Sequence, residues 1–415
     1  MHAPAKTFTH ETSNDDLASG HATSLTAVQQ PCSTTLPNET LTAIFFGLSP
    51  AALTLIGRVC RQWRVVAEWI LYTNVDISET LSVTSPFPYN TSRCCQTLVT
   101  YSHLARSLRK FHIRWMSDPR DCYDPRLQTV LSSLFRAIDL ADNLKSLELD
   151  LGLPSLPVYP TSTSFVLPTG DMTLRSLRHI SFNGTGYFAP SRLAQFLNNV
   201  PSIQYLRLPD YGDQIALLPN ALPSLISFCG SSRAAAAVLP GRPVQALALI
   251  GHCSVADTEL SRMAMTSIPL RHLDMSAILT TPILLRSVSR NLPMIESLKV
   301  KLALRHTLHF AMSGIRLLVA LSHLLGAFYR LLTLDLSPTH VDYTGLSNST
   351  EELFLCQSWQ LACPSLRRVV FPSQIAWGYH EERQTWVPVL PKGSRKRPSF
   401  YSSSPMKKHL GALNS

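Results

Sequence analysis

The sequence contains little charge, and its cysteines follow no motif. Charged residues make up only 15% of the 415 residues, whereas 45% are apolar, so most of the chain must fold and bury a core. The nine cysteines include no C-x-x-C pair, and their odd number leaves at least one unpaired. This pattern favours reduced thiols, and therefore a cytoplasmic and/or nuclear location, over a disulfide framework.

The chain also lacks an apolar N-terminal segment and a long uninterrupted apolar run. Residues 1–16 are polar, unlike a secretory signal. The longest apolar stretch, residues 315–336, is interrupted by Arg316, His323 and Arg330. It therefore predicts a buried helix that runs into a strand, and no association with a membrane.

Signatures of common catalytic sites are missing as well. There is no G-x-S-x-G motif, no Walker loop and no H-E-x-x-H. The segment from Gly184 to Ala189 has the spacing of a dinucleotide fingerprint, but the next helix is expected at Pro190 rather than at the glycines, which favours a turn. His306 and His309 could share a helical face, yet no acid or cysteine lies nearby to complete a metal site. We therefore predict no enzyme, no cofactor and no metal.

The positive charge is concentrated at the C-terminus. The formal net charge is +10, and residues 383–415 contain seven Lys or Arg and no acid. The rest of the chain carries only +3, which argues against a nucleic-acid-binding body. The basic groups 395–397 and 407–408 fit a two-part nuclear import signal and a solvated tail about equally well.

Order is expected to begin after residue 33, because residues 1–33 are polar and show no apolar period. Residues 38–48 carry apolar side chains at the spacing of one helical face. Ser49 and Pro50 predict the start of a second helix, which carries Leu53, and a third is expected over residues 58–71. Residues 75–78 then alternate like a short strand.

A repeated spacing of apolar residues covers most of the remaining chain. The pattern is apolar-x-x-apolar-x-apolar, and several of its copies are 20–29 residues apart, as in leucine-rich repeats. One strand with its return helix cannot bury an apolar face alone, so neighbouring copies should stack into a continuous core. The copies are Leu108/Phe111/Ile113, Leu144/Leu147/Leu149, Leu177/Ile180/Phe182, Ile203/Leu206/Leu208, the degenerate Leu225/Phe228, Val244/Leu247/Leu249, Leu270/Leu273/Met275, Ile295/Leu298/Val300, Leu331/Leu334/Leu336 and Leu366/Val369/Phe371.

These segments predict an α/β fold in which a short helical unit precedes an irregular, horseshoe-like solenoid. The solenoid is expected over residues 79–382, with a proline-rich insertion at 154–171. Residues 383–415 are expected to form a disordered basic tail.

The helical unit, residues 34–78, resembles an F-box. Its Leu36-Pro37-x-Glu39 start, the Ile44-Phe45 pair, the stretch Val59-Cys60-Arg61-x-Trp63 and the late Leu71-Tyr72 have the separations of that family. An F-box before irregular leucine-rich repeats resembles the large F-box families of fungi. The resemblance implies docking on a Skp-family adaptor, and through it on a cullin-based ubiquitin ligase.

Carried over position by position, the resemblance implies a set of residues that contact the adaptor or brace the contacting face. A 45-residue unit is also too small to bury all of these side chains internally, and an exposed apolar patch marks a partner surface. The implied set is Leu36, Pro37, Ile44, Phe45, Leu48, Leu53, Val59, Cys60 and Trp63.

The concave strand face of the solenoid is the expected target-binding surface, because its outward side chains recur in every layer. These are the residues between the last two apolar positions of each copy, and their signs are mixed. They are His112, Glu148, Ser181, Arg207, Ala248, Asp274, Lys299 and Asp335.

The sequence therefore predicts a non-catalytic substrate receptor of a ubiquitin ligase, which binds a target protein but neither nucleic acid nor a membrane. The alternative is a leucine-rich-repeat scaffold whose helical module does not dock on an adaptor. A nucleotide-dependent enzyme built on the glycine turn is a more distant third.

Overall fold

The structure is a computed structural model of the whole chain. It describes residues 36–82, 84–117, 126–152, 174–184, 190–209, 211, 215–251, 254–303, 316–339 and 349–389. The predicted N-terminal tail (1–33), the insertion (154–171) and the basic groups after residue 389 lie outside these residues.

The chain begins with three short helices. They are α1 (Asn38–Phe45), α2 (Pro50–Ile56) and α3 (Arg61–Thr73). The predicted start of α2 is confirmed, since the backbone N–H of Ala52 donates to the Ser49 hydroxyl and Pro50 occupies the first helical turn. The first helix ends earlier than predicted. Gly47 adopts a left-handed backbone with φ of +102°, which turns Leu48 away from the helix axis.

A single curved sheet follows, and its strands pair in strict chain order. Thirteen strands occur in the described residues, and neighbours from β1 to β11 pair in parallel. The strands are β1 (Asn74–Leu81), β2 (Lys110–Ser117), β3 (Ser146–Leu151), β4 (His179–Asn183), β5 (Tyr205–Leu208), β6 (Ser227–Gly230), β7 (Ala246–Leu249), β8 (His272–Thr280), β9 (Ser297–Leu302), β10 (Thr333–Asp335), β11 (Arg368–Val370), β12 (Ala376–His380) and β13 (Thr385–Val389).

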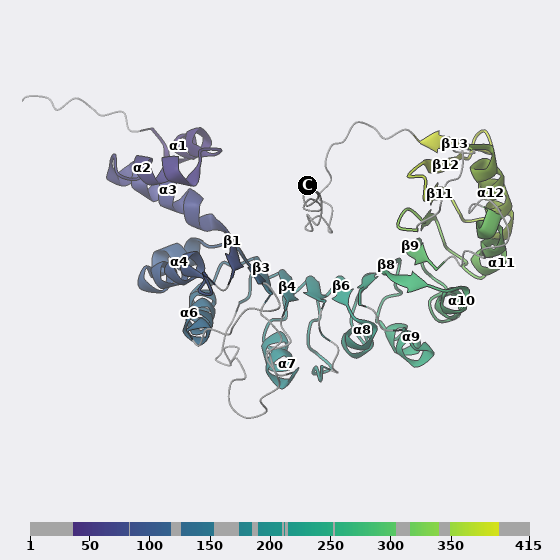
Figure 1. Cartoon of the computed structure of the whole chain (residues 1–415), viewed down its shortest axis with the longest axis horizontal. Helices are drawn as coiled ribbons and strands as arrows, with labels where there is room; N and C mark the ends of the chain where they lie inside the picture. Colours follow the sequence, from purple (N-terminus) through teal and green to yellow (C-terminus); the bar gives the residue numbers. More distant parts are fainter. Residues whose placement is uncertain are drawn as a thin grey trace, which may run out of the picture.

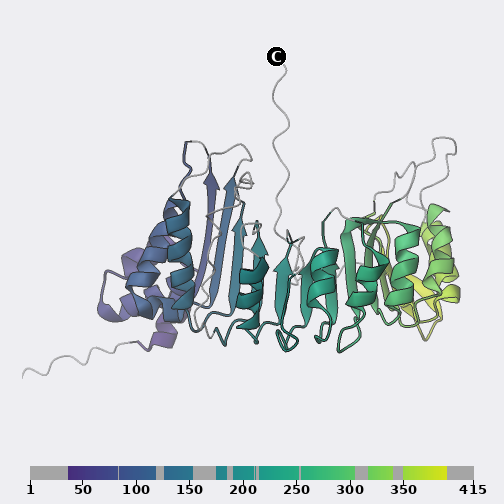
Figure 2. The same ribbon diagram turned by 90° about the horizontal axis from the view of Figure 1, so that it is seen from below.

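Helices cover the outer side of this sheet and leave its inner side open, so the solenoid forms an arc (Figure 1). Seen from below, the strands run side by side from one edge of the arc to the other (Figure 2). The helical segments are α4 (Tyr89–Thr100), α5 (Ser102–Ser107), α6 (Leu127–Asp139), α7 (Pro190–Asn198), α8 (Ser232–Val238), α9 (Asp257–Met263), α10 (Pro282–Asn291), the 3-10 helix η1 (Arg316–Leu321), α11 (Ser322–Leu325) and α12 (Ser349–Ala362).

The repeated apolar residues form one continuous core between the strands and the helices. Every residue of the ten predicted copies is buried, with at most 3% of its surface exposed. The predicted horseshoe-like solenoid is therefore confirmed, including the degenerate copy, which forms β6. No helix in the described part of the chain is long and apolar enough to cross a membrane.

The first strand joins the two parts without a linker. Asn74 of β1 directly follows the last residue of α3, and β1 pairs with β2 over eight residues. The helical unit nevertheless keeps its own small core of Leu41, Phe45, Leu53, Val66 and Ala67, separate from that of the solenoid. The arc therefore begins inside the segment that resembles an F-box.

The far end of the arc is closed by an antiparallel hairpin that corrects part of the predicted tail. Residues 385–389 form β13, which pairs with β12, although they were predicted to belong to a disordered segment. Trp386 is 3% exposed, and its indole N–H donates to Gln360 at 2.8 Å. This buried side chain outweighs the proline and charge content that suggested disorder. Pro388 in the outermost strand also discourages further strand pairing.

Glu352 on α12 is expected to hold this hairpin in place. Its side chain is 1% exposed and accepts hydrogen bonds from the Ser373 hydroxyl (2.6 Å) and the Trp377 indole N–H (2.8 Å). Glu352→Ala should lower the free energy of unfolding by about 2 kcal/mol, because both donors lose a charged acceptor in the interior. Urea denaturation followed by tryptophan fluorescence measures this. Gln357→Ala, on the exposed side of the same helix, should change stability by less than about 0.5 kcal/mol; equal losses would contradict the prediction.

Candidate functional site

The helical unit presents apolar side chains to solvent around a core too small to bury them. Of the nine residues implied in docking, six are exposed and two, Phe45 and Leu53, belong to the core. Trp63 is half-buried, with its ring edge-on to Phe45 at a centroid distance of 5.4 Å. Phe45, Leu53 and Trp63 therefore brace the surface. The exposed set, called the docking face below, is Leu36, Pro37, Ile44, Leu48, Val59 and Cys60.

Polar contacts fix two parts of the docking face next to each other. The Gln62 side-chain amide donates to the Leu36 carbonyl oxygen at 2.6 Å and to the Asn38 side chain at 3.1 Å. The Cys60 sulfur accepts the backbone N–H of Trp63 at 3.5 Å, which caps α3. Leu36 and its neighbour Pro37 are thus held beside the first turn of α3.

Further exposed apolar residues of the helical unit were not predicted, and three of them expose more than half of their surface. Phe46, Leu55 and Val65 expose 77%, 64% and 60% of their surface. The signal for them is available in the sequence, because each lies off the buried face of its own segment, which is marked by Phe45, Leu53 and Val66. So much exposed apolar area on a 45-residue unit is typical of a partner surface.

A groove between α2 and α3 lies at the border of this face. Its walls combine Leu53, Gly57 and Leu71 with the side chains of Arg58, Arg61 and Arg64. Arg64 forms an ion pair with Glu68, with its Nε 2.7 Å from a carboxylate oxygen. The apolar face is therefore bordered on this side by polar and cationic groups, as is common at the rim of protein interfaces.

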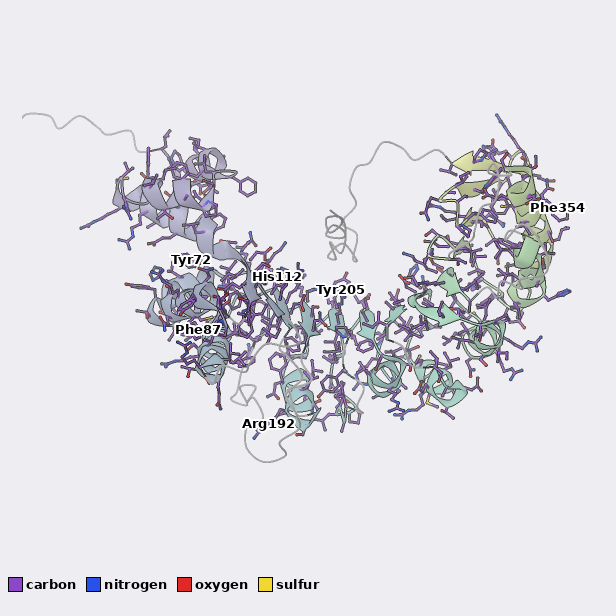
Figure 3. The ribbon with its side chains drawn as sticks, in the orientation of Figure 1. Tyr72, Phe87, His112, Arg192, Tyr205 and Phe354 are labelled. Atoms are coloured by element: carbon purple, nitrogen blue, oxygen red, sulfur yellow. The ribbon has the colours of Figure 1, made fainter. Side chains whose placement is uncertain are left out.

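The second candidate surface is the concave face, where the register of the sheet aligns all the predicted target-binding residues. Figure 3 shows His112 and Tyr205 on the inner side of the arc and Arg192 on its outer side. Each predicted residue is the Cα partner of the next along the sheet, except that Cys229 lies between Arg207 and Ala248. The complete row is Asp76, His112, Glu148, Ser181, Arg207, Cys229, Ala248, Asp274, Lys299, Asp335 and Val370.

At the N-terminal end of this row, carboxylates and histidines alternate. His112 lies 3.3 Å from Asp76 and 3.8 Å from Glu148, and the other carboxylate oxygen of Glu148 lies 3.4 Å from His179. Burial lowers the pKa of His179, although Glu148 acts in the opposite direction. Arg114 likewise lies 3.3 Å from Asp150. The polar side chains in this part of the concave face therefore contact one another.

The middle of the row is lined by small side chains. Cys229 and Ala248 lie between Arg207 and Asp274, so the surface there carries short groups between two charged ones. Cys229 was not among the predicted residues, because the degenerate copy lacks its last apolar residue. Burial raises the pKa of its thiol to about 11, which keeps it protonated at neutral pH. A protonated thiol is a weak nucleophile.

Towards the C-terminal end of the row, the charged side chains already interact with other groups of the protein. Asp274 and Asp335 each accept the backbone N–H of the residue two positions on, at 2.8 and 2.9 Å. Lys299 lies 4.0 Å from Asp274. These residues remain on the concave face, but their charges are partly balanced.

The other motifs noted in the sequence add no site to the described residues. Gly184 has a φ of +69°, and a Cβ there would overlap the Leu151 carbonyl oxygen, so its role is that of a turn. The next helix begins at Pro190, as predicted. Gly186, His306 and His309 lie outside the described residues, within which no group of three or more His, Cys, Asp or Glu could hold a metal ion.

Comparison with known proteins supports the identification of the helical unit. Residues 34–78 match the family model described as F-box-like. No curated protein sequence matched the chain. Among solved structures, the leucine-rich repeat-containing protein LegL7 from Legionella pneumophila aligns over 84% of this chain and 92% of that one, with 15% identity and a TM-score of 0.38. A likeness this weak adds nothing to the repeat assignment, which rests on the strand order and core of the chain itself.

The three helices, their exposed apolar face and the family match thus coincide in one segment. The strands of the sheet that follows pair in the order of the repeats. The chain is an F-box-like domain joined directly to an irregular leucine-rich-repeat solenoid.

Proposed function

We propose that this chain is the substrate-binding subunit of a ubiquitin ligase of the Skp-cullin-F-box type. The F-box-like domain docks on a Skp-family adaptor and through it on a cullin, and the solenoid binds the protein to be modified. The observation that carries this proposal is the apolar docking face within residues 34–78, the segment that matches the F-box-like model. Such an architecture is typical of non-catalytic subunits, so ubiquitin transfer is assigned to the partners.

The proposal also places the chain in the cytoplasm and/or the nucleus. Support comes from the cysteines, since the six in the described residues are free. The rival function, a repeat scaffold without ligase assembly, shares the solenoid and differs only in the docking face. Co-purification of the full chain with a purified Skp-family adaptor and its cullin distinguishes the two. Failure to form this complex would leave the scaffold function in its place.

The concave face is expected to bind the target. Combined reversal of three of its charges, Arg207→Glu, Asp274→Lys and Lys299→Glu, should weaken target capture by at least about tenfold, because like charges would then face each other across the interface. Affinity purification with quantitative mass spectrometry measures the proteins lost relative to the unmodified chain.

The matched control is Arg286→Glu on the outer helix α10, which changes the net charge by the same amount. It should leave both target capture and adaptor binding unchanged. Target capture that survives the triple reversal would place the binding surface elsewhere on the solenoid.

A further inference from the structure

The edge of the sheet at which the strands begin carries a column of cations in three adjacent layers, those of β2, β3 and β4. Arg109, Lys145 and Arg178 each directly precede one of these strands, and their backbones hydrogen-bond in sequence. The N–H of Lys145 donates to the Arg109 carbonyl at 2.8 Å, and that of Arg178 to the Lys145 carbonyl at 2.9 Å. Neighbouring strands lie about 4.8 Å apart, so the three side chains emerge within about 10 Å of one another. We call these three residues the basic edge.

The basic edge is not neutralised within the described residues. All three side chains are exposed, and no described carboxylate forms an ion pair with any of them. The exposed carboxylates of Asp139, at the end of α6, and Asp142, in the turn before β3, are among those that form no ion pair with the basic edge.

In later layers, the cations at the same position of the sheet form ion pairs with carboxylates of the protein. Arg271 precedes β8 and lies 3.9 Å from Glu296, the corresponding residue of the next layer. Arg367 precedes β11 and lies 2.8 Å from Glu381. Like charges in adjacent layers repel each other, and the protein compensates these two arginines internally. The layers of β2, β3 and β4 lack that compensation, which points to an anion supplied from outside.

The surroundings of the basic edge restrict what this anion can be. Lys110 lies next to Arg109 and adds a further exposed cation. Further along the strands, however, the concave face carries the carboxylates of Asp76 and Glu148. A nucleic-acid strand needs a broad basic footprint, and its phosphates would meet these carboxylates. A short acidic stretch of polypeptide can stay on the edge, because at about 3.4 Å per residue about four extended residues span the roughly 10 Å of the three layers.

We propose that the basic edge binds an acidic segment of a polypeptide, in which a run of Asp or Glu spans the layers of β2, β3 and β4. The proposal rests on the target-binding half of the proposed function and deepens it by naming the chemistry of the bound segment. It does not depend on the docking face, which lies on the helical unit.

A fluorescein-labelled deca-glutamate peptide tests this proposal by fluorescence anisotropy with the full chain at low salt. The triple variant Arg109→Glu/Lys145→Glu/Arg178→Glu should bind the peptide at least about tenfold more weakly, since three attractive charge pairs become repulsive on reversal. Raising the salt concentration should weaken binding by the unmodified chain, because exposed charges are screened.

A control of equal charge change is available on the outer helices. Arg262, Arg286 and Arg290 are exposed on α9 and α10, and their reversal to Glu should change the peptide affinity by less than about twofold. Circular dichroism establishes that both variants are folded. An equal loss of affinity in the control would show attraction by overall charge and would overturn the proposal.

Two further outcomes would also overturn it. One is the absence of deca-glutamate binding by the unmodified chain. The other is tighter binding of a deca-thymidylate strand through the same three residues, which would assign the edge to nucleic acid. Adaptor co-purification is scored separately on the same protein, so a chain that assembles with the adaptor but ignores the peptide refutes only this inference.

Discussion

Replacement of Ile44 and Val59 by glutamate is expected to weaken binding to a Skp-family adaptor by at least about 100-fold. Both side chains lie on the docking face, with 56% and 62% of their surface exposed. In an apolar interface each new carboxylate would lose its hydration without gaining a partner, and truncation of a single central contact already costs about 2 kcal/mol or more. Isothermal titration calorimetry with the purified adaptor measures its affinity for the unmodified chain and for the double variant.

Because Ile44 and Val59 are exposed, their substitution should affect adaptor binding without affecting stability. Surface substitutions usually change stability by less than about 0.5 kcal/mol, so the double variant should unfold at nearly the same urea concentration as the unmodified chain. The matched control is Ile283→Glu/Leu361→Glu, on α10 and α12, where 80% and 86% of the residue surface is exposed. The control should bind the adaptor normally. Adaptor affinity within about threefold of normal in the Ile44/Val59 variant would remove the docking face from the proposal.

Phe45 supports the docking face from behind and is not expected to contact the adaptor itself. It is 3% exposed and packs against Trp63, so Phe45→Ala should weaken adaptor binding only through loss of the local core. The family pattern could not separate Phe45 from Ile44, since adjacent positions belong to one motif. The helical period could not separate them either, because the spacing from Leu41 to Leu48 places Ile44 and Phe45 on the same predicted face. Burial depends on how α3 packs against α1, and that packing cannot be predicted from a single sequence.

Most of the solenoid could be predicted because each layer repeats the same physical requirement. Each strand buries two residues that face the helices, and a third buried residue precedes them by three positions. This requirement produces the spacing seen in the predicted copies. The first layer follows the same spacing with Tyr72, Val75 and Ile77, but these residues also fall inside the F-box-like segment. The short strand was therefore predicted without being assigned to the sheet.

The shared first strand decides how the two parts can be studied separately. A fragment that began at residue 79 would divide β1. It would retain Glu79, whose carboxylate accepts the backbone N–H groups of Asn90 and Thr91, but without the strand that positions it. Point substitutions on the docking face are therefore the better test of adaptor binding than deletion of the helical unit.

The closing hairpin could not be predicted from the repeat, because a cap must end the pattern rather than continue it. Neither β12 nor β13 has the repeat spacing, and both are antiparallel. The basic edge was not predicted for a different reason. Arg109, Lys145 and Arg178 occupy the variable positions of three copies, and only the register of the sheet shows that they form a column.

Arg242 is expected to be the most important single polar side chain for the stability of the central layers. It is 4% exposed and lies in the turn between α8 and β7. Its guanidinium donates to the carbonyl oxygens of Ala221 (2.9 Å), Leu218 (3.0 Å), Val238 and Pro240. Burial lowers its pKa, but the carbonyl dipoles replace the lost water. One side chain thus binds four backbone carbonyls of the segment between β5 and β7, of which Leu218 also accepts the backbone N–H of Ala221.

Arg242→Met should therefore lower the free energy of unfolding by about 3 kcal/mol. Apolar replacement of a buried ion pair is often neutral when both partners are removed, but here the acceptors are backbone carbonyls that remain in place, and only Leu218 keeps a backbone donor. Arg242→Lys should recover only part of the loss, because an ammonium group cannot reach carbonyls on opposite sides as a planar guanidinium does. Urea denaturation measures all three proteins, with the exposed Arg233→Met on α8 as the control for loss of charge. If Arg242→Met were as stable as this control, the four carbonyl contacts would contribute nothing, and apolar packing alone would hold the central layers together.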